Sequence, residues 1–327
     1  MSATLSRSTR PVGAEGGSPE RVAVVEGCRR WWHVVVVAGI ALFLAVVVLH
    51  PFPLSDPVLY RGDAFQHEIL TGAADGWGSP APSADVAAPP SPDSAVVPPG
   101  TVQLPLFVLH ALRVASGGVI AAVNLYLLVG VVVTAVVAFA VLRWMGLRPL
   151  LAGAAAVVFT FAPAFSSAVF QGHLFLFALY PVALAVWLAL WSTMTGPRSR
   201  PPRSELVLAT SAVVVTSLSS AYYTAFAVVV ILAVGSAVAA RRRSVSSLLR
   251  PGAVVLGLAA VAGASLVPNL IARRGDPAAG ALRRTAADVW RYSLRPQDLL
   301  VLGDDHPLGP LARGLRELGS SAVRPGT

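Results

Sequence analysis

Four ionisable side chains lie close together in the stretch V-L-Y-R-G-D-A-F-Q-H-E-I-L, in a chain of which only 13% of the residues are charged. They are Arg61, Asp63, His67 and Glu68. A carboxylate in apolar surroundings becomes a better base, because burial disfavours its charged form. The planar donors of an arginine suit the oxygens of a phosphate group. The stretch therefore supplies residues for proton transfer and phosphate binding, although a solvated loop would have the same composition.

The composition predicts an integral membrane protein. The chain has 327 residues, of which 55% are hydrophobic, and a mean hydropathy of +0.69. This leaves too little polar surface to cover a soluble globule. The net charge of +9 comes from arginines in short clusters between apolar runs, not from a basic surface interleaved with aromatic residues, so we expect no nucleic-acid partner. The single cysteine, Cys28, excludes a disulfide framework and a thiolate metal cluster.

The apolar runs predict an all-α polytopic protein with about seven transmembrane helices. The runs are 33–49, 119–142, 150–165, 174–191, 206–218, 222–239 and 253–271. The third and fifth runs are short for a span. The first run is followed by H-P-F-P-L, which offers no small-residue cleavage site, so it fits an uncleaved signal anchor better than a signal peptide.

The arginines predict how these helices cross the membrane. They follow the second, fourth and sixth runs and also precede the first, whereas the short connections at 166–173 and 219–223 contain none. Since arginines favour the cytoplasmic side, we expect a cytoplasmic N-terminus in the plasma membrane. The even-numbered connections then face the cytoplasm and the odd-numbered connections face outward.

This topology divides the chain into three parts. Residues 1–30 are polar and are predicted to be a disordered cytoplasmic segment. Residues 31–272 form the transmembrane module, which includes a long extracytoplasmic loop at 51–118. Residues 273–327 form an extracytoplasmic tail without an eighth apolar run, which is typical of either a short natural form or a truncated one. The arginines of this tail are unexpected on the outward side, but long segments obey the charge rule weakly.

Further polar side chains are predicted on the same outward side as Asp63. They are Gln171 and His173 in one turn, Tyr222 and Tyr223 in the next, and Arg291 and Arg295 in the tail. Together they have the layout of a site at the outer membrane surface. A capping histidine would equally explain His173, and tyrosines are common at membrane interfaces without binding anything.

Three other features predict structure rather than chemistry. Pro181, inside the fourth run, should kink that helix. Asn124 and Asn269 are expected to form hydrogen bonds between helices. The apolar stretch that begins at Leu104 suits a short helix on the outer surface.

Several short motifs together resemble the bacterial branch of the GT-C glycosyltransferases, most closely the YfhO-like membrane proteins of actinobacteria. In chain order they are R-G-D after the first run, A-V-N-L-Y, Q-G-H-L, S-S-A-Y-Y-T-A-F, Y-S-L-R-P-Q-D-L-L and H-P-L-G. The resemblance extends from about residue 32 to residue 310. It depends on the order and topological placement of the motifs, because each motif is short.

The resemblance implies a module of seven spans and an inverting glycosyltransferase activity. Such enzymes transfer a sugar from a polyprenyl-phosphate donor to an extracytoplasmic lipid or glycan acceptor. Asp63 then corresponds to the catalytic aspartate that serves as general base. The implied substrate-binding residues are Arg61, His67, Glu68, Gln171, His173, Tyr222, Tyr223, Arg291 and Arg295.

Two departures from the family pattern bear on this function. Many relatives have paired acids where this chain has one Asp, with Glu68 as the nearest second acid. The additional spans and soluble C-terminal domain that are common in the superfamily are missing from this sequence. A divalent metal on Asp63 with His67 or His173 is an alternative to arginines, but a hard cation prefers more oxygen ligands, so we expect no metal.

Two other classes of function compete with the enzyme. A secondary transporter would carry ionisable residues within its spans and show an internal repeat, and neither feature is evident in the sequence. A non-catalytic membrane scaffold would explain the missing C-terminal portion. An Asp63→Asn variant separates an enzyme from a scaffold, because only an enzyme would lose sugar transfer.

Overall fold

The computed structural model describes residues 19–56, 102–162, 175–194 and 201–272. Every regular element in these ranges is a helix. The helices are α1 (Pro19–Leu49), α3 (Gln103–Ser116), α4 (Val119–Trp144), α5 (Pro149–Thr160), α7 (Tyr180–Met194), α8 (Arg203–Ser219), α9 (Ala221–Arg242), the 3-10 helix η3 (Val245–Leu248) and α10 (Leu249–Ala272). The predicted all-helical class is therefore confirmed for the described part of the chain.

Four stretches of helix are long and apolar enough to cross a membrane: Trp31–Leu49, Val119–Trp144, Ala221–Arg242 and Val245–Val267. They match the first, second, sixth and seventh predicted spans. Many of their large apolar side chains are exposed, including Phe43 at 66% and Val229 at 65%. Exposed apolar surface of this extent needs a lipid environment. The chain is thus a helical membrane protein.

The other three predicted spans form shorter helices. The helix α5 has 12 residues, α7 has 15 and α8 has 17. At about 1.5 Å per residue, α5 extends for only about 18 Å, against a hydrocarbon thickness of about 30 Å. The count of seven spans therefore stays a prediction, whereas four of the described helices are long and apolar enough to cross a membrane.

Two local predictions differ from the structure. The helix α1 begins at Pro19, so helix extends into the N-terminal segment that was predicted to be disordered up to residue 30. Pro181 does not kink a helix, because it is the second residue of α7. Proline is well tolerated there, since the first backbone N–H groups of a helix have no partner within the helix. The residues just before it, Phe175 to Leu179, are not helical.

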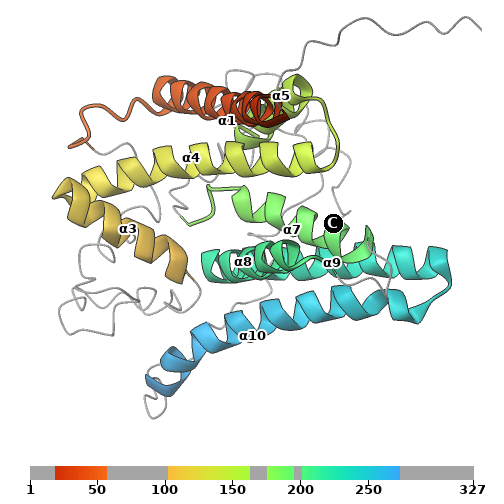
Figure 1. The fold of residues 1–327 in the computed structure, drawn as a ribbon. Helices are drawn as coiled ribbons and strands as arrows, with labels where there is room; N and C mark the ends of the chain where they lie inside the picture. The colour runs from red at the N-terminus through yellow and green to blue at the C-terminus, as the bar shows by residue number, and fades with distance from the viewer. Residues whose placement is uncertain (1–18, 57–101, 163–174, 195–200, 273–327) are drawn as a thin grey trace, which may run out of the picture.

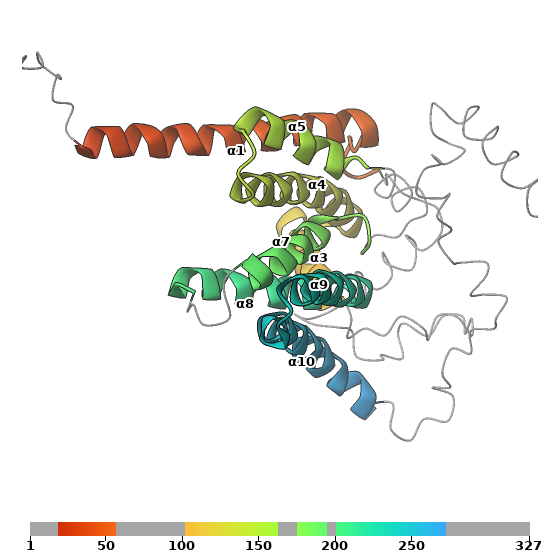
Figure 2. The same ribbon diagram turned by 90° about the vertical axis from the view of Figure 1, so that its right-hand side faces the viewer.

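The helices lie in successive layers that are visible in two views (Figure 1 and Figure 2). The helices α1 and α5 lie on one side of α4, and α7 lies on the other, followed by α8 with α9 and then by α10. The core forms two clusters: one joins α1, α3, α4 and α5, and the other joins α7 to α8, α9 and α10. The two clusters meet where α4 packs on α7.

Small residues bring the first layers together. Ala41 and Ala45 of α1 and Ala152 and Ala156 of α5 have no exposed surface. Each pair is spaced four residues apart, so both members lie on one helix face. Alanine at such positions lets helix backbones approach closely, which is the main source of packing energy where lipid replaces water.

The described helices have two chemically different ends. At the first, which we call the arginine end, arginines stand at helix termini: Arg143, Arg148, Arg203, Arg241, Arg242, Arg243 and Arg250. At the second, the tyrosine end, lie Tyr126, Tyr180 and Tyr223 with neighbouring Asn and Ser residues. The arginine distribution that suggested the topology is thus gathered at one end of the described helices.

Candidate functional site

Of the ten residues predicted to form the site, the structure describes two, Tyr222 and Tyr223. The other eight lie outside the described residues: Arg61, Asp63, His67, Glu68, Gln171, His173, Arg291 and Arg295. The proposed meeting of Asp63 with the later outward turns therefore stays a prediction. The described part of the tyrosine end shows where the chain enters and leaves these segments.

Tyr223 joins α9 to the start of α7. Its side chain is buried, and its hydroxyl donates a hydrogen bond of 2.6 Å to the Leu176 carbonyl. Leu176 lies in the non-helical residues before α7, where backbone groups lack helical partners, so this bond satisfies one of them. Tyr223 therefore has a structural role at the point where the 163–174 segment rejoins the described chain.

A second tyrosine bond joins α7 to α8. The Tyr180 hydroxyl and the Ser219 Oγ are 3.0 Å apart, and Ser219 Oγ also donates to the Val215 carbonyl at 2.6 Å. Because the Ser219 proton is used in the second bond, Tyr180 is the donor in the first. The next residue, Ser220, caps α9 by accepting from the Tyr222 backbone N–H at 3.3 Å. The tight α8 to α9 turn is thereby held at the tyrosine end.

Asn124 fixes the beginning of the long 51–118 loop. It is buried in the first turns of α4, and its side-chain amide donates to the carbonyls of Leu54 at 3.0 Å and of Asp56 at 2.8 Å. These residues follow the end of α1. Asn124 therefore links α4 to the connection after α1 through these two backbone carbonyls, whereas the predicted bond to a second helix stays a prediction.

Aromatic packing fills the space between these polar links. The rings of Tyr126 and Phe177 meet edge to face, with centroids 5.4 Å apart. Phe177 in turn lies directly on Gly130, where a Cβ atom would overlap its ring. Tyr126 also has Tyr180 and Tyr223 as close neighbours. The three tyrosines therefore lie near one another at this end of the helices.

The two tyrosines predicted to act together point to different surroundings. The side chain of Tyr222 is 62% exposed, whereas only 7% of Tyr223 is exposed. Consecutive residues on a helix point about 100° apart, which accounts for the difference. Of this pair, Tyr222 has the side chain that a ligand or an interfacial lipid could contact.

Sequence reasoning missed Tyr126 and Tyr180 as neighbours of Tyr223. Tyr126 stands in the A-V-N-L-Y motif and Tyr180 just before Pro181. The available signal was that both lie in the outward half of a predicted span. Their meeting depends on which helices are neighbours, and the sequence pattern does not carry that information.

The buried polar side chains in the described part of the tyrosine end are neutral, whereas Asp56 at the same end is exposed. Among the described residues the buried polar side chains are Asn, Ser and Thr, and no group of three or more His, Cys, Asp and Glu residues is assembled there for a metal ion. Neutral groups of this kind can orient a ligand, but they cannot act as a base near neutral pH. The residues predicted for acid-base chemistry at this end, Asp63 and His173, lie outside the described residues.

Comparison of the chain with protein-family models, with characterised proteins and with solved structures finds no match. Membership of the GT-C superfamily therefore remains an inference from the motifs of the sequence.

Proposed function

We propose that this membrane protein is a GT-C-type glycosyltransferase that moves a sugar from a polyprenyl-phosphate donor to an extracytoplasmic lipid or glycan acceptor. In the proposed reaction the Asp63 carboxylate takes the proton of the acceptor hydroxyl. The freed oxygen bonds to the anomeric carbon from the face opposite the phosphate. The bond between that carbon and the phosphate oxygen breaks, and the prenyl phosphate leaves with the electron pair. The configuration at the anomeric carbon is thereby inverted.

The observation that carries the proposal is the arrangement of the tyrosine end. Asn124 holds Asp56, from which the chain continues to Asp63, and Tyr223 holds Leu176, which closely follows Gln171 and His173. Both anchors lie at the same end of the described helices as Tyr222. This supports a shared location for the three predicted clusters, because each is tethered to that end by a neighbouring residue.

The described interior favours an enzyme at the membrane surface over a secondary transporter. None of the buried side chains in the described residues is acidic or basic. A transporter that couples to ions is expected to carry such groups near the middle of its spans. A scaffold without catalysis would have the same interior as an enzyme, so an activity measurement has to separate these two.

The test is sugar transfer by membranes that contain the full chain, with a labelled polyprenyl-phosphate sugar as donor. Loss of a general base is expected to lower the rate by about a hundredfold or more, so Asp63→Asn should abolish most of the transfer. Asp56→Asn is the matched control, because the exposed Asp56 side chain contacts only Ser55 among the described residues, at 3.4 Å.

Equal insertion of both variants into the membrane has to be shown by immunoblotting. Transfer that survives in Asp63→Asn would overturn the role of this residue as base. Absence of transfer by the unmodified chain across the donors tried would favour the scaffold.

A further inference from the structure

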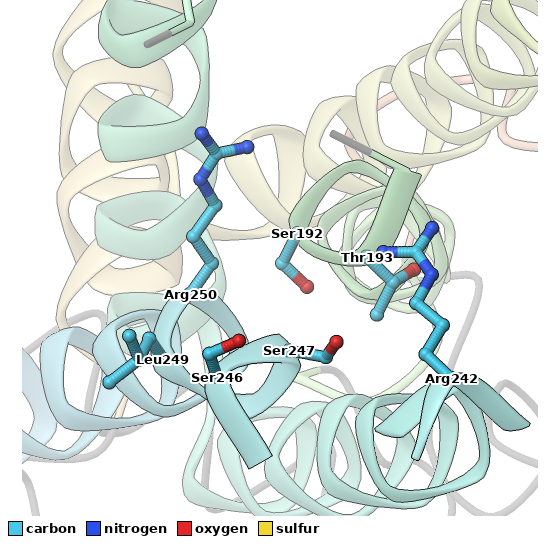
Figure 3. A pocket seen from close by; sticks show the side chains of 7 residues that line it. All are labelled: Ser192, Thr193, Arg242, Ser246, Ser247, Leu249 and Arg250. Carbon is cyan, nitrogen blue, oxygen red and sulfur yellow. The ribbon is translucent and has the colours of Figure 1, made fainter. Parts of the chain in front are cut away.

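A small pocket opens at the arginine end, far from the tyrosine end along the helices. Its lining residues come from the end of α7 (Ser192 and Thr193), the end of α9 (Arg242), η3 (Ser246 and Ser247) and the start of α10 (Leu249 and Arg250). Three helix termini and the short η3 connection therefore converge on one point. In Figure 3 the guanidinium groups of Arg242 and Arg250 stand on opposite sides of the pocket, with the four hydroxyl groups between them.

The charge of the lining is entirely positive. Two of the seven lining residues are arginines, and none is acidic. The nearest acidic residue of α8, Glu205, does not line the pocket and instead accepts a hydrogen bond of 3.1 Å from the Trp191 indole. The Ser192 and Thr193 hydroxyls already donate to the Ala189 carbonyl, at 3.0 and 2.9 Å, and the Ser246 Oγ lies 2.8 Å from the Ser244 Oγ. The two guanidinium groups and the hydroxyls of Ser246 and Ser247 are therefore the donors that the lining can offer to the oxygens of an anion.

The position of Arg250 is unfavourable with respect to its own helix. It is the second residue of α10, where the backbone N–H groups already give the helix terminus a partial positive charge. A cation is normally preferred at the opposite terminus, where Arg242 stands in the last turn of α9. An anion in the pocket would be attracted by both guanidinium groups.

The surroundings of the pocket are apolar on one side. Leu249 in the lining is 70% exposed, and the neighbouring Val245 is 81% exposed. Exposed aliphatic side chains beside a pocket with two cations fit a molecule that has both a charged and an apolar part. Basic pockets between transmembrane helices bind anionic lipid headgroups in this way.

We infer that this pocket binds a phosphate group, with the headgroup of an anionic phospholipid as its expected source. The fork of each guanidinium would donate to phosphate oxygens, and the hydroxyls of Ser246 and Ser247 would complete the ring of donors. The inference is independent of the proposed glycosyl transfer, because it concerns the other end of the molecule.

The experiment compares binding of phosphatidylglycerol by the full-length protein in nanodiscs of phosphatidylcholine with increasing phosphatidylglycerol content. Binding is followed by the thermal unfolding temperature and by native mass spectrometry. The double variant Arg242→Gln/Arg250→Gln should bind phosphatidylglycerol at least about tenfold more weakly, since each charged donor that is lost weakens a charge-assisted bond. Arg241→Gln is the matched control, because it removes one exposed arginine of the same helix terminus that does not line the pocket.

A second arm replaces the lipid with inorganic phosphate in phosphatidylcholine nanodiscs. Stabilisation by inorganic phosphate that depends on the same two arginines would support phosphate binding and identify the free anion as a source. A double variant that binds like the unmodified protein, or an unmodified protein that binds neither ligand, would overturn the inference.

The variant Ser246→Ala/Ser247→Ala keeps the test valid if the arginine variant fails to fold. It leaves the net charge unchanged and should still weaken binding of the phosphate group. Unchanged phosphatidylglycerol binding by a folded serine variant would show that the hydroxyls do not contact the ligand, which contradicts the ring of donors described above.

Discussion

The polar side chains of the tyrosine end act on backbone groups of irregular segments. Asn124 donates to two carbonyls that follow α1, and Tyr223 donates to one that precedes α7. In a membrane a carbonyl without a partner costs several kcal/mol, so each such bond fixes the path of a connection. These residues therefore determine where the long loop and the 163–174 segment begin and end.

Tyr223→Phe is predicted to destabilise the protein, because it removes the hydroxyl that satisfies the Leu176 carbonyl and leaves the ring in place. The expected loss is about 0.5–1.5 kcal/mol in the free energy of unfolding. Tyr222→Phe is the matched control and should change stability little, since Tyr222 is exposed. Thermal unfolding of both variants in detergent measures the difference, and equal stabilities would argue against the Tyr223 bond.

At the scale of elements, α4 contributes to both core clusters, as α7 does. It contacts α1, α3, α5 and α7. The ring of Phe177, from the segment before α7, packs directly against Gly130 of α4. Close contact at this glycine allows α4 and α7 to approach, in the manner of small residues in other membrane helices. The short helices α5 and α7 depend on this packing, since neither is long enough to be stable alone.

Gly130→Ala is predicted to destabilise the packing of α4 against the segment before α7 by about 1–3 kcal/mol, because the new methyl group overlaps the Phe177 ring. Gly39→Ala in α1 is the matched control, because a Cβ at Gly39 meets nothing within 4 Å. The measurement is again the unfolding temperature in detergent.

The cause of this effect can be checked with a second substitution. Phe177→Leu combined with Gly130→Ala should recover part of the lost stability, since the smaller side chain leaves room for the methyl group. Strictly additive losses in the double variant would show that Phe177 is not the obstacle.

For the whole molecule, the decisive feature is that most described arginines lie at the end of the helices opposite the tyrosines, with Arg113 in the last turn of α3 as an exception. The arginines stand at the C-termini of α4 and α9 and near the N-termini of α5, α8 and α10. A membrane protein with this distribution orients its arginine end toward the cytoplasm. The tyrosine end would then face outward, as the proposed transfer from an extracytoplasmic donor requires.

This orientation is predicted to govern the labelling of single cysteines in intact cells. In a Cys28→Ser background, Asp56→Cys at the tyrosine end should react with a membrane-impermeant maleimide. Ser246→Cys at the arginine end should react only after the cells are permeabilised. Both positions are exposed in the structure, so neither is shielded from the reagent by the described part of the protein. The reverse pattern would invert the topology and exclude an extracytoplasmic active site near Tyr222.

The sequence by itself determined that the protein is helical and membrane-bound, where most helices begin and end, and on which side the arginines gather. These properties follow from local hydropathy and from charge in short connections, which act without reference to the rest of the fold. The resemblance of its motifs also supplied the proposed function and Asp63 as its base, and both remain predictions.

Only the tertiary structure decided which helices are neighbours. It placed Pro181 at a helix start, turned Tyr222 and Tyr223 to different surroundings, joined Tyr180 to Ser219 and brought Arg242 and Arg250 to one pocket. Contacts such as that between Tyr180 and Ser219 join residues of different helices, and they depend on how helix faces of similar apolar composition fit together. Hydropathy scarcely distinguishes those faces, because lipid and the protein interior are both apolar.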